Sequence, residues 1–431
     1  MDTLQNNLLP LPIDILDDSI IKVMGVGGGG CNAVNYMYRQ GIGGVTFLVC
    51  NTDKQVLEKS SVPAKLQLGP GLGAGGDPEK AHEYAENSRD RIKEALDDGT
   101  KMLFITAGMG GGTGTGASAT IAEVAQDMDI LTVGIVTIPF AFEGKKKIRK
   151  ALTGVAKLAE HVDAILIINN EKLKQIYKDL DAFNAFNKSD DVVCNAAKSI
   201  AEIITVPGYI NTDFADVYNT LKNGKVAIMN VGQASGDNRI TTAIDNALKS
   251  PLANSSDVHG AKRILLQFYC SKEHAVVMDE FDQINRFVDE VGDEVEVQWG
   301  ISIDDSLGEA VRVTIIATGY AVSDIPSLQD EAGRVSVDDA MESNYGDLAR
   351  SDKHKEDEQP AQLDLTNVVT NAGKPSNGET KTASNSQTAT NGEVRSADEI
   401  EITFEDEDET EQKPEPVKPE RTSRFPWMRG K

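Results

Sequence analysis

Five short apolar runs constrain the fold of this chain more than any other feature of its sequence. Each run has six to eight residues and is followed by a stretch with helical periodicity. Such runs form strands that are buried on both faces of a parallel sheet, between two layers of helices. The runs are residues 20–26, 45–50, 102–107, 131–138 and 164–169. The first half of the chain is therefore predicted to be an α/β domain with a Rossmann-like parallel sheet.

A second group of apolar runs predicts another, smaller α/β domain. Its candidate strands are residues 226–231, 263–270, 294–299 and 311–318. In residues 294–299, EVEVQW, apolar and polar side chains alternate strictly, as they do in a strand with one solvated face. A chain of 431 residues is also too long for a single hydrophobic core, so two domains are expected.

Between the two groups, residues 189–205 predict one long helix. Apolar side chains recur around most of its circumference, so it is expected to lie buried between the two domains. Ser189, Asp190 and Asp191 are predicted to cap its amino end, where acidic groups also suit the helix dipole. The Pro-Gly pair at 207–208 should end it.

The composition changes after Tyr320. Residues 321–420 are rich in Ser, Thr, Asn, Gln, Glu and Asp and poor in aromatic residues, which predicts a disordered acidic linker. The last eleven residues, 421–431, carry four basic side chains and no acidic one. The large apolar residues of this segment are Phe425, Trp427 and Met428. This combination favours a peptide that docks on a partner over a merely solubilising tail.

The charge of the chain excludes several kinds of partner. Of the formal net charge of −25, residues 321–431 contribute −12 and residues 1–320 the remaining −13. A chain this acidic has no general attraction for nucleic acid or anionic lipid. The amino-terminal segment does not resemble a secretory signal, and no stretch approaches the roughly 20 apolar residues that span a bilayer. We therefore expect a cytoplasmic protein without a nucleic-acid partner and without direct membrane insertion.

The cysteines and histidines predict neither a disulfide nor a metal site. No CxxC pair is present, and the cysteines have apolar or glycine-rich neighbours, which is typical of reduced thiols in a cytosol. The histidines are scattered along the chain. The cysteines are Cys31, Cys50, Cys194 and Cys270, and the histidines are His82, His161, His259, His274 and His354.

A glycine cluster follows the first predicted strand, in residues 25–35, GVGGGGCNAVN. Glycines allow backbone N–H groups to approach a phosphate closely, and the helix that follows offers its positive end. The pattern also suits a Rossmann dinucleotide site, in which Asp53 would be the acidic residue that binds the ribose. This loop alone therefore leaves more than one kind of nucleotide open.

A second glycine loop separates these alternatives. Residues 102–128 again indicate a strand, a loop and a helix, and the loop, 110–116, consists of glycine and threonine alone. Its N–H groups and two hydroxyls can surround a β- and a γ-phosphate, and the helix that starts near Thr115 directs its dipole at them. Two phosphate loops suit a triphosphate better than a dinucleotide. The chain has no GxxxxGK[ST] motif, so it is not a P-loop NTPase.

These motifs resemble those of the tubulin/FtsZ family of GTPases, in particular its FtsZ branch. The loop GGGTGTG is the signature of the family, and the other three motifs stand at its usual spacing. The four motifs are GGGGCN (27–32), NTD (51–53), GGGTGTG (110–116) and FEGKKK (142–147). The resemblance covers residues 20 to about 320. It implies a GTPase that binds GTP and GDP.

The resemblance also implies which residues bind GTP. They are Gly28, Gly29, Gly30, Cys31, Asn32, Gly110, Gly111, Gly112, Thr113, Gly114, Thr115, Gly116, Glu143, Lys147, Asn170, Phe186 and Asp191. Phe186 would stack on the guanine, and Asp191 would accept from its N1 and N2 donors, a pairing that selects guanine over adenine. Without the resemblance, Phe186 is typical of a core residue and Asp191 of a helix-terminus charge.

Other positions of this set have implied roles or depart from the family. Gly112, Thr113 and Gly114 would contact the γ-phosphate, and Glu143 would bind the ribose. Lys147 stands where arginine is usual, so it keeps the charge without the bidentate geometry. Cys31 stands where glycine is common, which predicts a more crowded and more easily oxidised loop.

The segment NTDFADV, residues 211–217, follows the long helix and carries Asn211, Asp213 and Asp216. Taken alone, it is typical of a helix N-cap and first turn. The resemblance implies that this loop enters the nucleotide pocket of the next subunit. There the two carboxylates would orient and polarise the attacking water, and Asn211 would help to position the loop. Magnesium would bind through phosphate oxygens and water, and potassium is a further candidate ion.

The function that follows is an assembly-dependent GTPase whose head-to-tail filaments form the division ring at mid-cell. The alternatives are a Rossmann oxidoreductase and a polymer that binds but does not hydrolyse nucleotide. Through Phe425, Trp427 and Met428 the chain is expected to bind a membrane-tethering division protein resembling FtsA. The predicted parts are an N-terminal extension (1–18), a GTP-binding domain (19–188), a central helix (189–206), a C-terminal α/β domain (207–320), a linker (321–420) and a terminal peptide (421–431).

Overall fold

The computed structural model describes residues 19–176, 182–206, 208–249, 260–292 and 294–320. The predicted N-terminal extension, the linker and the terminal peptide with Phe425, Trp427 and Met428 lie outside the described residues. All of the described residues belong to one compact unit.

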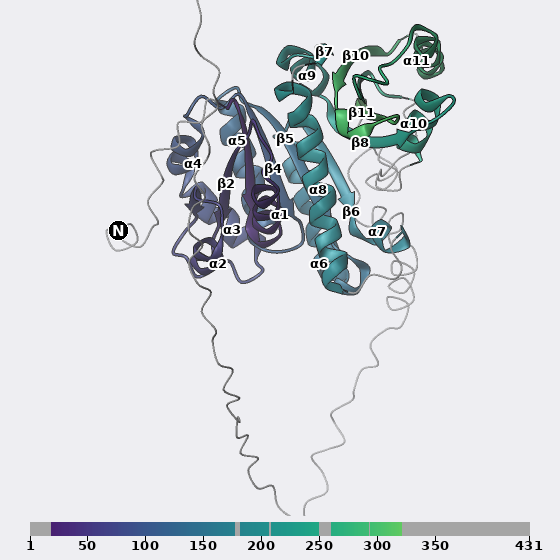
Figure 1. The fold of residues 1–431 in the computed structure, drawn as a ribbon. Helices are drawn as coiled ribbons and strands as arrows, with labels where there is room; N and C mark the ends of the chain where they lie inside the picture. Colours follow the sequence, from purple (N-terminus) through teal and green to yellow (C-terminus); the bar gives the residue numbers. More distant parts are fainter. Residues whose placement is uncertain (1–18, 177–181, 207, 250–259, 293, 321–431) are drawn as a thin grey trace, which may run out of the picture. The chain divides into compact units, whose positions relative to one another are not determined.

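The first half forms the predicted parallel sheet with a helix after most strands (Figure 1). The sheet order is β3-β2-β1-β4-β5-β6, and each neighbouring pair is parallel. The strands are β1 (Ile21–Val26), β2 (Thr46–Asn51), β3 (Lys65–Gln67), β4 (Met102–Gly108), β5 (Leu131–Ile138) and β6 (Ala164–Asn169). The helices are α1 (Gly27–Gln40), α2 (Lys54–Lys59), α3 (Pro78–Glu86), α4 (Arg89–Leu96), α5 (Thr113–Asp127), α6 (Lys145–Ala159) and α7 (Asn170–Ile176), with a 3-10 turn at Ala141–Glu143. The α/β prediction is confirmed, while the three-residue strand β3 was missed.

The second half extends the same sheet with mixed strands. Strand β8 lies parallel to β6 at its start, and β11 is antiparallel to both β8 and β9. The strands are β7 (Gly208–Ile210), β8 (Lys225–Ala234), β9 (Arg263–Cys270), β10 (Glu296–Ile303) and β11 (Val311–Tyr320). The helices are α9 (Phe214–Leu221), α10 (Arg239–Leu248) and α11 (Met278–Val291), with a 3-10 turn at Asp305–Leu307. The second α/β group is thus confirmed, and β7 is an edge strand that the sequence did not indicate.

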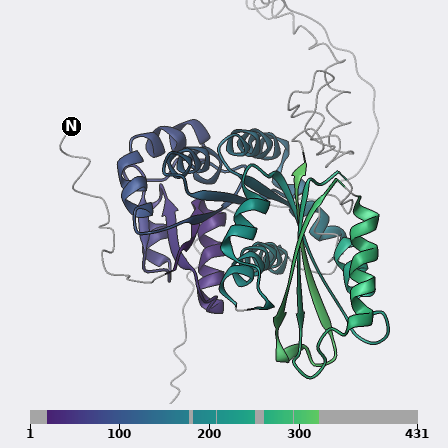
Figure 2. The same cartoon turned by 90° about the horizontal axis from the view of Figure 1, so that it is seen from above.

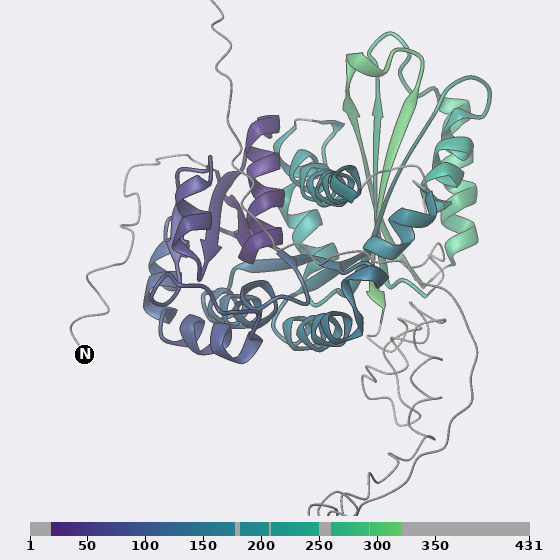
Figure 3. The ribbon, with the colours of Figure 1, turned by 90° about the horizontal axis from the view of Figure 1, so that it is seen from below.

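Helices cover both faces of the parallel strands, as the views of Figures 2 and 3 show. On one face, buried side chains of β1, β4 and β5 pack against α1 and the long helix α8 (Ala182–Thr205). On the other face, the alternate side chains of the same strands pack against α3 to α6. This arrangement explains why the strands read as continuous apolar runs.

Helix α8 is longer than predicted. It begins at Ala182, so Ser189, Asp190 and Asp191 lie inside it, and the prediction that they cap its amino end is wrong. Serine and aspartate are tolerated inside a helix when their side chains find partners elsewhere. Here Ser189 donates to the Asn170 side chain at 2.7 Å. The helix ends at Thr205, before the Pro-Gly pair, as predicted.

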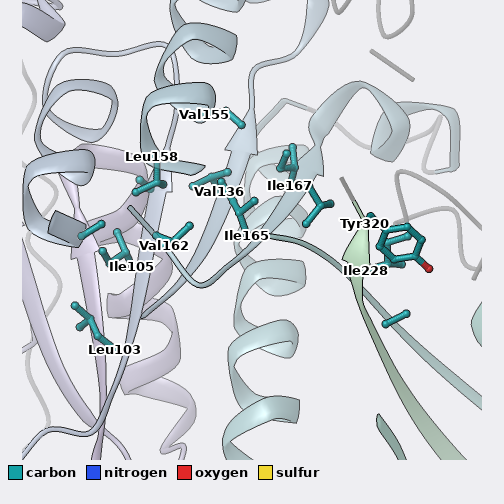
Figure 4. Close-up of a cluster of buried hydrophobic side chains, with 14 of the residues drawn as sticks. Leu103, Ile105, Val136, Val155, Leu158, Val162, Ile165, Ile167, Ile228 and Tyr320 are labelled. Atoms are coloured by element: carbon teal, nitrogen blue, oxygen red, sulfur yellow. The ribbon is translucent and has the colours of Figure 1, made fainter. Parts of the chain in front are cut away.

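One hydrophobic cluster runs from the parallel strands into the second half of the chain (Figure 4). Ile165 on β6 lies at its centre and is 1% exposed. Helix α6 contributes Val155 and Leu158, and β8 contributes Ile228. Burial of each such side chain stabilises the fold by about 1.5–3 kcal/mol. This shared core joins the two groups of strands.

We expect Ile165→Ala to lower the free energy of unfolding by about 2–5 kcal/mol, because it removes buried methyl groups and leaves a cavity. Ile303→Ala is the matched control, since Ile303 is 38% exposed at the end of β10. That change should cost within about 0.5 kcal/mol. Urea unfolding of both variants measures the difference, and equal losses would contradict the assignment of the core.

Candidate nucleotide site

Two helices begin side by side at the carboxyl edge of the parallel sheet. Helix α1 starts at Gly27 directly after β1, and α5 starts at Thr113 after the loop that leaves β4. Their N-cap residues, Val26 and Gly112, make no side-chain hydrogen bond to the first turn. The free N–H groups and the positive ends of both helix dipoles therefore favour an anion at this edge.

The glycines allow the two loops to touch backbone to backbone. A Cβ atom at Gly30 would overlap the carbonyl oxygen of Thr106 on β4. Gly27 has φ +73°, and a Cβ there would stand 2.6 Å from the backbone nitrogen of Gly114. At Gly28, by contrast, a Cβ would meet no atom within 4 Å. Gly27 thus allows the first loop to pack on the second, Gly30 allows α1 to pack on β4, and Gly28 faces open space.

The two loops border a cavity of about 430 Å³, a size that suits a small-molecule ligand. From the predicted set it is lined by Gly28, Gly29, Gly30, Asn32, Gly111, Gly112, Thr113, Gly114, Glu143, Lys147, Asn170 and Phe186. Residues that the sequence analysis did not assign to the site also line it, among them Thr106, Met109, Thr137, Pro139, Ser189, Asp190 and Val193. The cavity therefore gathers residues from both glycine loops, from the segment after β5 and from helix α8.

Cys31 does not line the cavity. Its side chain is fully buried, with Sγ 3.6 Å from the carbonyl oxygens of Gly25 and Cys50. Burial raises the pKa of the Cys31 thiol to about 12, although hydrogen bonds oppose the shift. A buried protonated thiol reacts slowly with oxidants, so the prediction of a crowded, oxidisable loop is wrong.

Gly110, Thr115 and Gly116 support the second loop from outside the cavity. Gly110 has φ +98°, and its N–H donates to the Thr115 hydroxyl at 2.8 Å. A Cβ at Gly116 would overlap the carbonyl of Pro78, so this glycine allows α5 to pack on α3. These three predicted contact residues hold the loop in shape, and they do not line the cavity.

Asp190, and not Asp191, lines the cavity. The Asp191 carboxylate is held by Lys188 Nζ at 2.6 Å and accepts from the Tyr36 hydroxyl at 3.3 Å. Burial raises the pKa of Asp190 to about 7, and the Arg39 guanidinium partly opposes the shift. Asp191, which was predicted to contact the base, therefore does not line the cavity, whereas its neighbour Asp190 does.

The phase of helix α8 explains this correction. Phe186, Asp190 and Val193 stand four and three residues apart, so they share one face of the helix, and all line the cavity. Asp191 is turned by about 100° from Asp190, away from this face. A helix that began at residue 189, as predicted from the sequence, would not contain Phe186 and so would not place it on one face with Asp190 and Val193.

Phe186 and the ion pair of Glu143 and Lys147 line the far wall of the cavity, and two further aromatic rings contact Phe186. Phe186 makes edge-to-face contact with Phe140 at a centroid distance of 5.2 Å, and Phe142 stacks on Phe140 at 5.0 Å. Glu143 accepts from the Phe140 N–H at 2.9 Å and pairs with Lys147. The half-exposed ring of Phe186 provides a flat apolar surface on which a base can stack.

The segment with Asn211, Asp213 and Asp216 lies apart from the cavity. Asp213 caps α9 by accepting from the Asp216 N–H at 3.1 Å, and Asp216 accepts from the Asp213 N–H at 3.0 Å. Asn211 accepts from the Gly208 N–H at 3.0 Å. Figure 1 shows α9 at the end of α8 where that helix finishes. From Asp190 to the end of α8 the axis rises about 22 Å, so the carboxylates cannot reach the cavity of their own chain.

Comparison with known proteins agrees with this geometry. The GTPase domain of the Tubulin/FtsZ family matches residues 20–178, and the C-terminal domain of the FtsZ family matches residues 225–321. The chain belongs to the tubulin/FtsZ family. It is therefore a GTPase, and both glycine loops of the cavity lie within the matched GTPase domain.

Individual members of the family are similar over most of the described part. The cell division protein FtsZ of Porphyromonas gingivalis is 50% identical over 306 residues, 70% of this chain and 67% of that protein. FtsZ of Aquifex aeolicus is 43% identical, over 70% of this chain and 83% of that protein. The empty FtsZ dimer of M. jannaschii superimposes with a TM-score of 0.63 at 36% identity, over 69% of this chain and 88% of that one.

The dinucleotide alternative has no support in this member of the tubulin/FtsZ family. Asp53, which would have been its ribose-binding acid, instead caps α2 by accepting from the Gln55 N–H at 2.9 Å. It does not line the cavity. Within the described residues no helix could cross a membrane, and no group of three His, Cys, Asp or Glu could hold a metal ion.

We expect Gly30→Ala to destabilise the protein by about 1–3 kcal/mol or more, because the added methyl group overlaps the Thr106 carbonyl. Gly28→Ala is the matched control. It should change the free energy of unfolding by no more than about 0.5 kcal/mol, since nothing lies within 4 Å of its Cβ. Thermal unfolding without nucleotide measures both, and similar losses would show that α1 does not lie against the β4 backbone at Gly30.

Proposed function

We propose that this chain is a polymerising GTPase of cell division that hydrolyses GTP at the junction of two subunits. The observation that carries the proposal is the separation of the phosphate loops from Asp213 and Asp216 by the length of α8. A single chain cannot bring the two together, whereas a head-to-tail neighbour can. Such contacts are heterologous and build open filaments.

The nucleotide is proposed to bind with its phosphates at the amino ends of α1 and α5. The cavity residues Gly28, Gly112 and Thr113 lie there. The guanine would stack on Phe186 with Asp190 as the acceptor for its N1 and N2 donors, because Asp190 lies on the same helix face. An ionised carboxylate that pairs with two adjacent donors discriminates against adenine.

The ribose end of the site would be held by Glu143, Lys147 and Asn170, which all line the cavity. Glu143 is paired with Lys147, and Asp190 is placed for the base, so neither carboxylate in the cavity is available to activate water. Phosphoryl transfer depends mainly on positioning and on charge stabilisation. Asp213 and Asp216 of a neighbouring subunit would orient and polarise the attacking water, with Asn211 holding their loop, while the N–H groups at the starts of α1 and α5 would stabilise the charge on the phosphates.

Exposed apolar side chains at both ends of the molecule support a filament contact. Leu72 is 88% exposed, and its strand bridge to Asp53 ties it to the loop after β2. Phe142, beside the cavity, is 63% exposed. At the other end, Tyr209 is 84% exposed, two residues before Asn211. Large exposed side chains of this kind mark interaction surfaces, and two different surfaces suit a head-to-tail contact.

Magnesium is proposed to bind through the phosphates of GTP. The described residues offer no cluster of three carboxylate, histidine or cysteine ligands. Mg²⁺ commonly keeps several waters and takes its remaining ligands from substrate phosphates, which fits such a site. When bound, the ion would neutralise charge on the β- and γ-phosphates. A requirement for potassium also stays a proposal and is measured by replacing K⁺ with Na⁺ in the GTPase assay.

The parts outside the described residues keep the roles that the sequence predicts. We propose that the linker, 321–420, tethers the terminal peptide, 421–431. That peptide would bind a membrane-tethering division protein resembling FtsA and so place the filaments at mid-cell. The boundaries proposed for the folded part are 19–188 for the GTP-binding domain, 189–206 for the central helix and 207–320 for the C-terminal domain.

We expect GTP affinity to fall about tenfold per pH unit below pH 7. Burial raises the pKa of Asp190 to about 7 in the empty protein, so at lower pH a proton must leave before the carboxylate can accept from guanine. Above pH 7 the affinity should level off. Equilibrium binding of a fluorescent GTP analogue between about pH 5.5 and 8 measures the profile.

Asp190→Asn should flatten this pH profile and reduce the preference for GTP over ATP, because the amide cannot accept from both donors. The titration of the GTP phosphates affects both proteins equally, so it cancels when the pH profile of the variant is compared with that of the wild type. Asp191→Asn is the matched control and should leave pH profile and selectivity unchanged, since Asp191 is bonded to Lys188 and Tyr36. The opposite result for the two variants would assign the base to Asp191.

We expect Asp213→Ala to bind GTP normally and to hydrolyse it about 10²-fold more slowly. Gly111→Glu should have the complementary defect, because the new carboxylate enters the open space at the phosphate loop. A mixture of the two variants should hydrolyse GTP faster than the sum of their separate rates. In the mixture, the Gly111→Glu subunit can present its Asp213 to GTP held by the Asp213→Ala subunit.

Asp237→Ala, at another exposed acidic position, is the control and should retain full activity. Phosphate release at fixed total protein concentration measures all three variants and the mixture. Hydrolysis within a single subunit would give a mixture no faster than the sum. If Asp213→Ala released phosphate at the wild-type rate, this loop would have no part in hydrolysis.

A further inference from the structure

An apolar surface that the proposed nucleotide and filament contacts do not use lies where α11 meets β10. Met278 is 80% exposed, Val277 is 57% exposed, and Trp299 is 36% exposed. The Trp299 ring packs against Phe281 with a centroid distance of 5.6 Å. We call these four residues, together with the nearby acids Asp282, Asp289, Glu294 and Glu296, the α11–β10 face. Exposed clusters of this kind mark interaction sites.

Acidic side chains flank the apolar residues. Asp282 and Asp289 follow Met278 by four and eleven residues, so the three side chains lie on one side of α11. Glu296 begins β10, Glu294 lies two residues before it, and both are exposed. None of these four acids has an ion pair within residues 19–176, 182–206, 208–249, 260–292 and 294–320. Arg286, also exposed, lies between Asp282 and Asp289 on this side of α11. The face is therefore apolar at its centre, and its rim carries four acids and one base, a net negative charge.

The sheet edge beside this face is open. Strand β10 pairs with β9 along its whole length, but β7 pairs with it only at Ile301 and Ser302. Among the described strands nothing pairs with the outer edge of residues 296–299. An open edge next to exposed apolar side chains is a surface on which an extended peptide can dock.

The terminal peptide, 421–431, is chemically complementary to this face. It carries four basic side chains, no acidic one, and three large apolar residues. A second folded copy of this chain fits less well, because residues 1–320 carry a net charge of −13 and would bring like charges together. Charge complementarity therefore selects the peptide over another acidic core.

The linker allows the peptide to reach the face. A flexible chain of the length predicted for the linker, about 100 residues, would span roughly 50–60 Å, and a folded part of about 300 residues has a radius of gyration near 19 Å. A tether of this length gives a local peptide concentration that can approach the millimolar range. The peptide of the same chain thus competes well against any dilute partner.

We propose that residues 421–431 dock on the α11–β10 face of their own chain. The arginines would pair with Asp282 and Asp289, and Phe425 and Trp427 would cover Met278, Phe281 and Trp299. While docked, the peptide is hidden from other partners. This inference does not depend on the GTPase mechanism, and it holds or fails whatever protein the peptide binds in the cell.

The chain has only two tryptophans, one on each proposed surface, which makes the test direct. The full chain without nucleotide is labelled with 5-fluorotryptophan, and Trp427→Phe identifies the ¹⁹F signal of Trp299. Deletion of 421–431 should shift the Trp299 signal. Salt at about 0.5 M should shift the signal of the intact chain to the same position, because screening weakens the ion pairs. An unchanged Trp299 signal on deletion would overturn the proposal.

A charge swap tests the pairing itself. Asp282→Lys with Asp289→Lys, and separately Arg424→Asp with Arg429→Asp, should each move Trp299 to its undocked position, and the four changes together should restore docking. Asp90→Lys with Asp97→Lys, at two exposed positions on and next to α4, is the control and should change nothing. Failure of the combined variant to restore the signal would refute the pairing.

Dilution of the intact chain distinguishes the occupants. Docking within one chain gives a Trp299 signal that does not depend on protein concentration. If the Trp299 signal moves on dilution only when 421–431 is present, the peptide of another copy docks on the face. If the signal also moves on dilution after 421–431 is deleted, the folded part of a second copy covers the face. Either result would overturn docking within the chain.

Discussion

The contact between the two glycine loops is the interaction on which the site depends. Because Gly27 has no side chain, the first turn of α1 can lie against the backbone nitrogen of Gly114 in the first turn of α5. This contact places the first turns of α1 and α5 next to each other, so that two sets of free N–H groups converge on one cavity. A single helix end binds one phosphate well, whereas two adjacent ends suit the higher charge of a triphosphate. Backbone packing thus determines the ligand class before any charged side chain contributes.

The length of helix α8 separates the cavity from the segment that carries Asp213. Its first half presents Phe186, Asp190 and Val193 to the cavity, and its far end leads into the segment with Asp213. A rigid helix of 24 residues keeps these two places apart. In the proposed mechanism, the same helix therefore supplies the residues that contact the base and keeps the catalytic carboxylates away from the cavity of their own chain. Hydrolysis then depends on a neighbour, so the length of α8 couples turnover to assembly in the proposed mechanism.

Sequence reasoning succeeded where the signal is local. The long strands and both glycine loops follow from apolar runs and glycine clusters within a few residues, and the structure shows them close to the predicted positions. It failed where position depends on distant contacts. Strands β3 and β7 have three residues each and exist because a neighbouring strand pairs with them. Asp190 could have been found from its helical spacing to Phe186, but only once α8 was extended back to Ala182.

The segment around Asp213 shows that an ordinary structural role and a catalytic one need not exclude each other. In the capping box each carboxylate accepts a backbone N–H of the other residue, which fixes both side chains at the start of α9. Each carboxylate keeps further acceptor capacity, because an ionised carboxylate has about four acceptor sites. Asp213 is exposed and Asp216 is half-buried. In the proposed mechanism the cap would therefore pre-organise two acceptors for a water molecule before a second subunit arrives. The pattern typical of a helix N-cap is, on this argument, the means by which the proposed catalytic geometry is built.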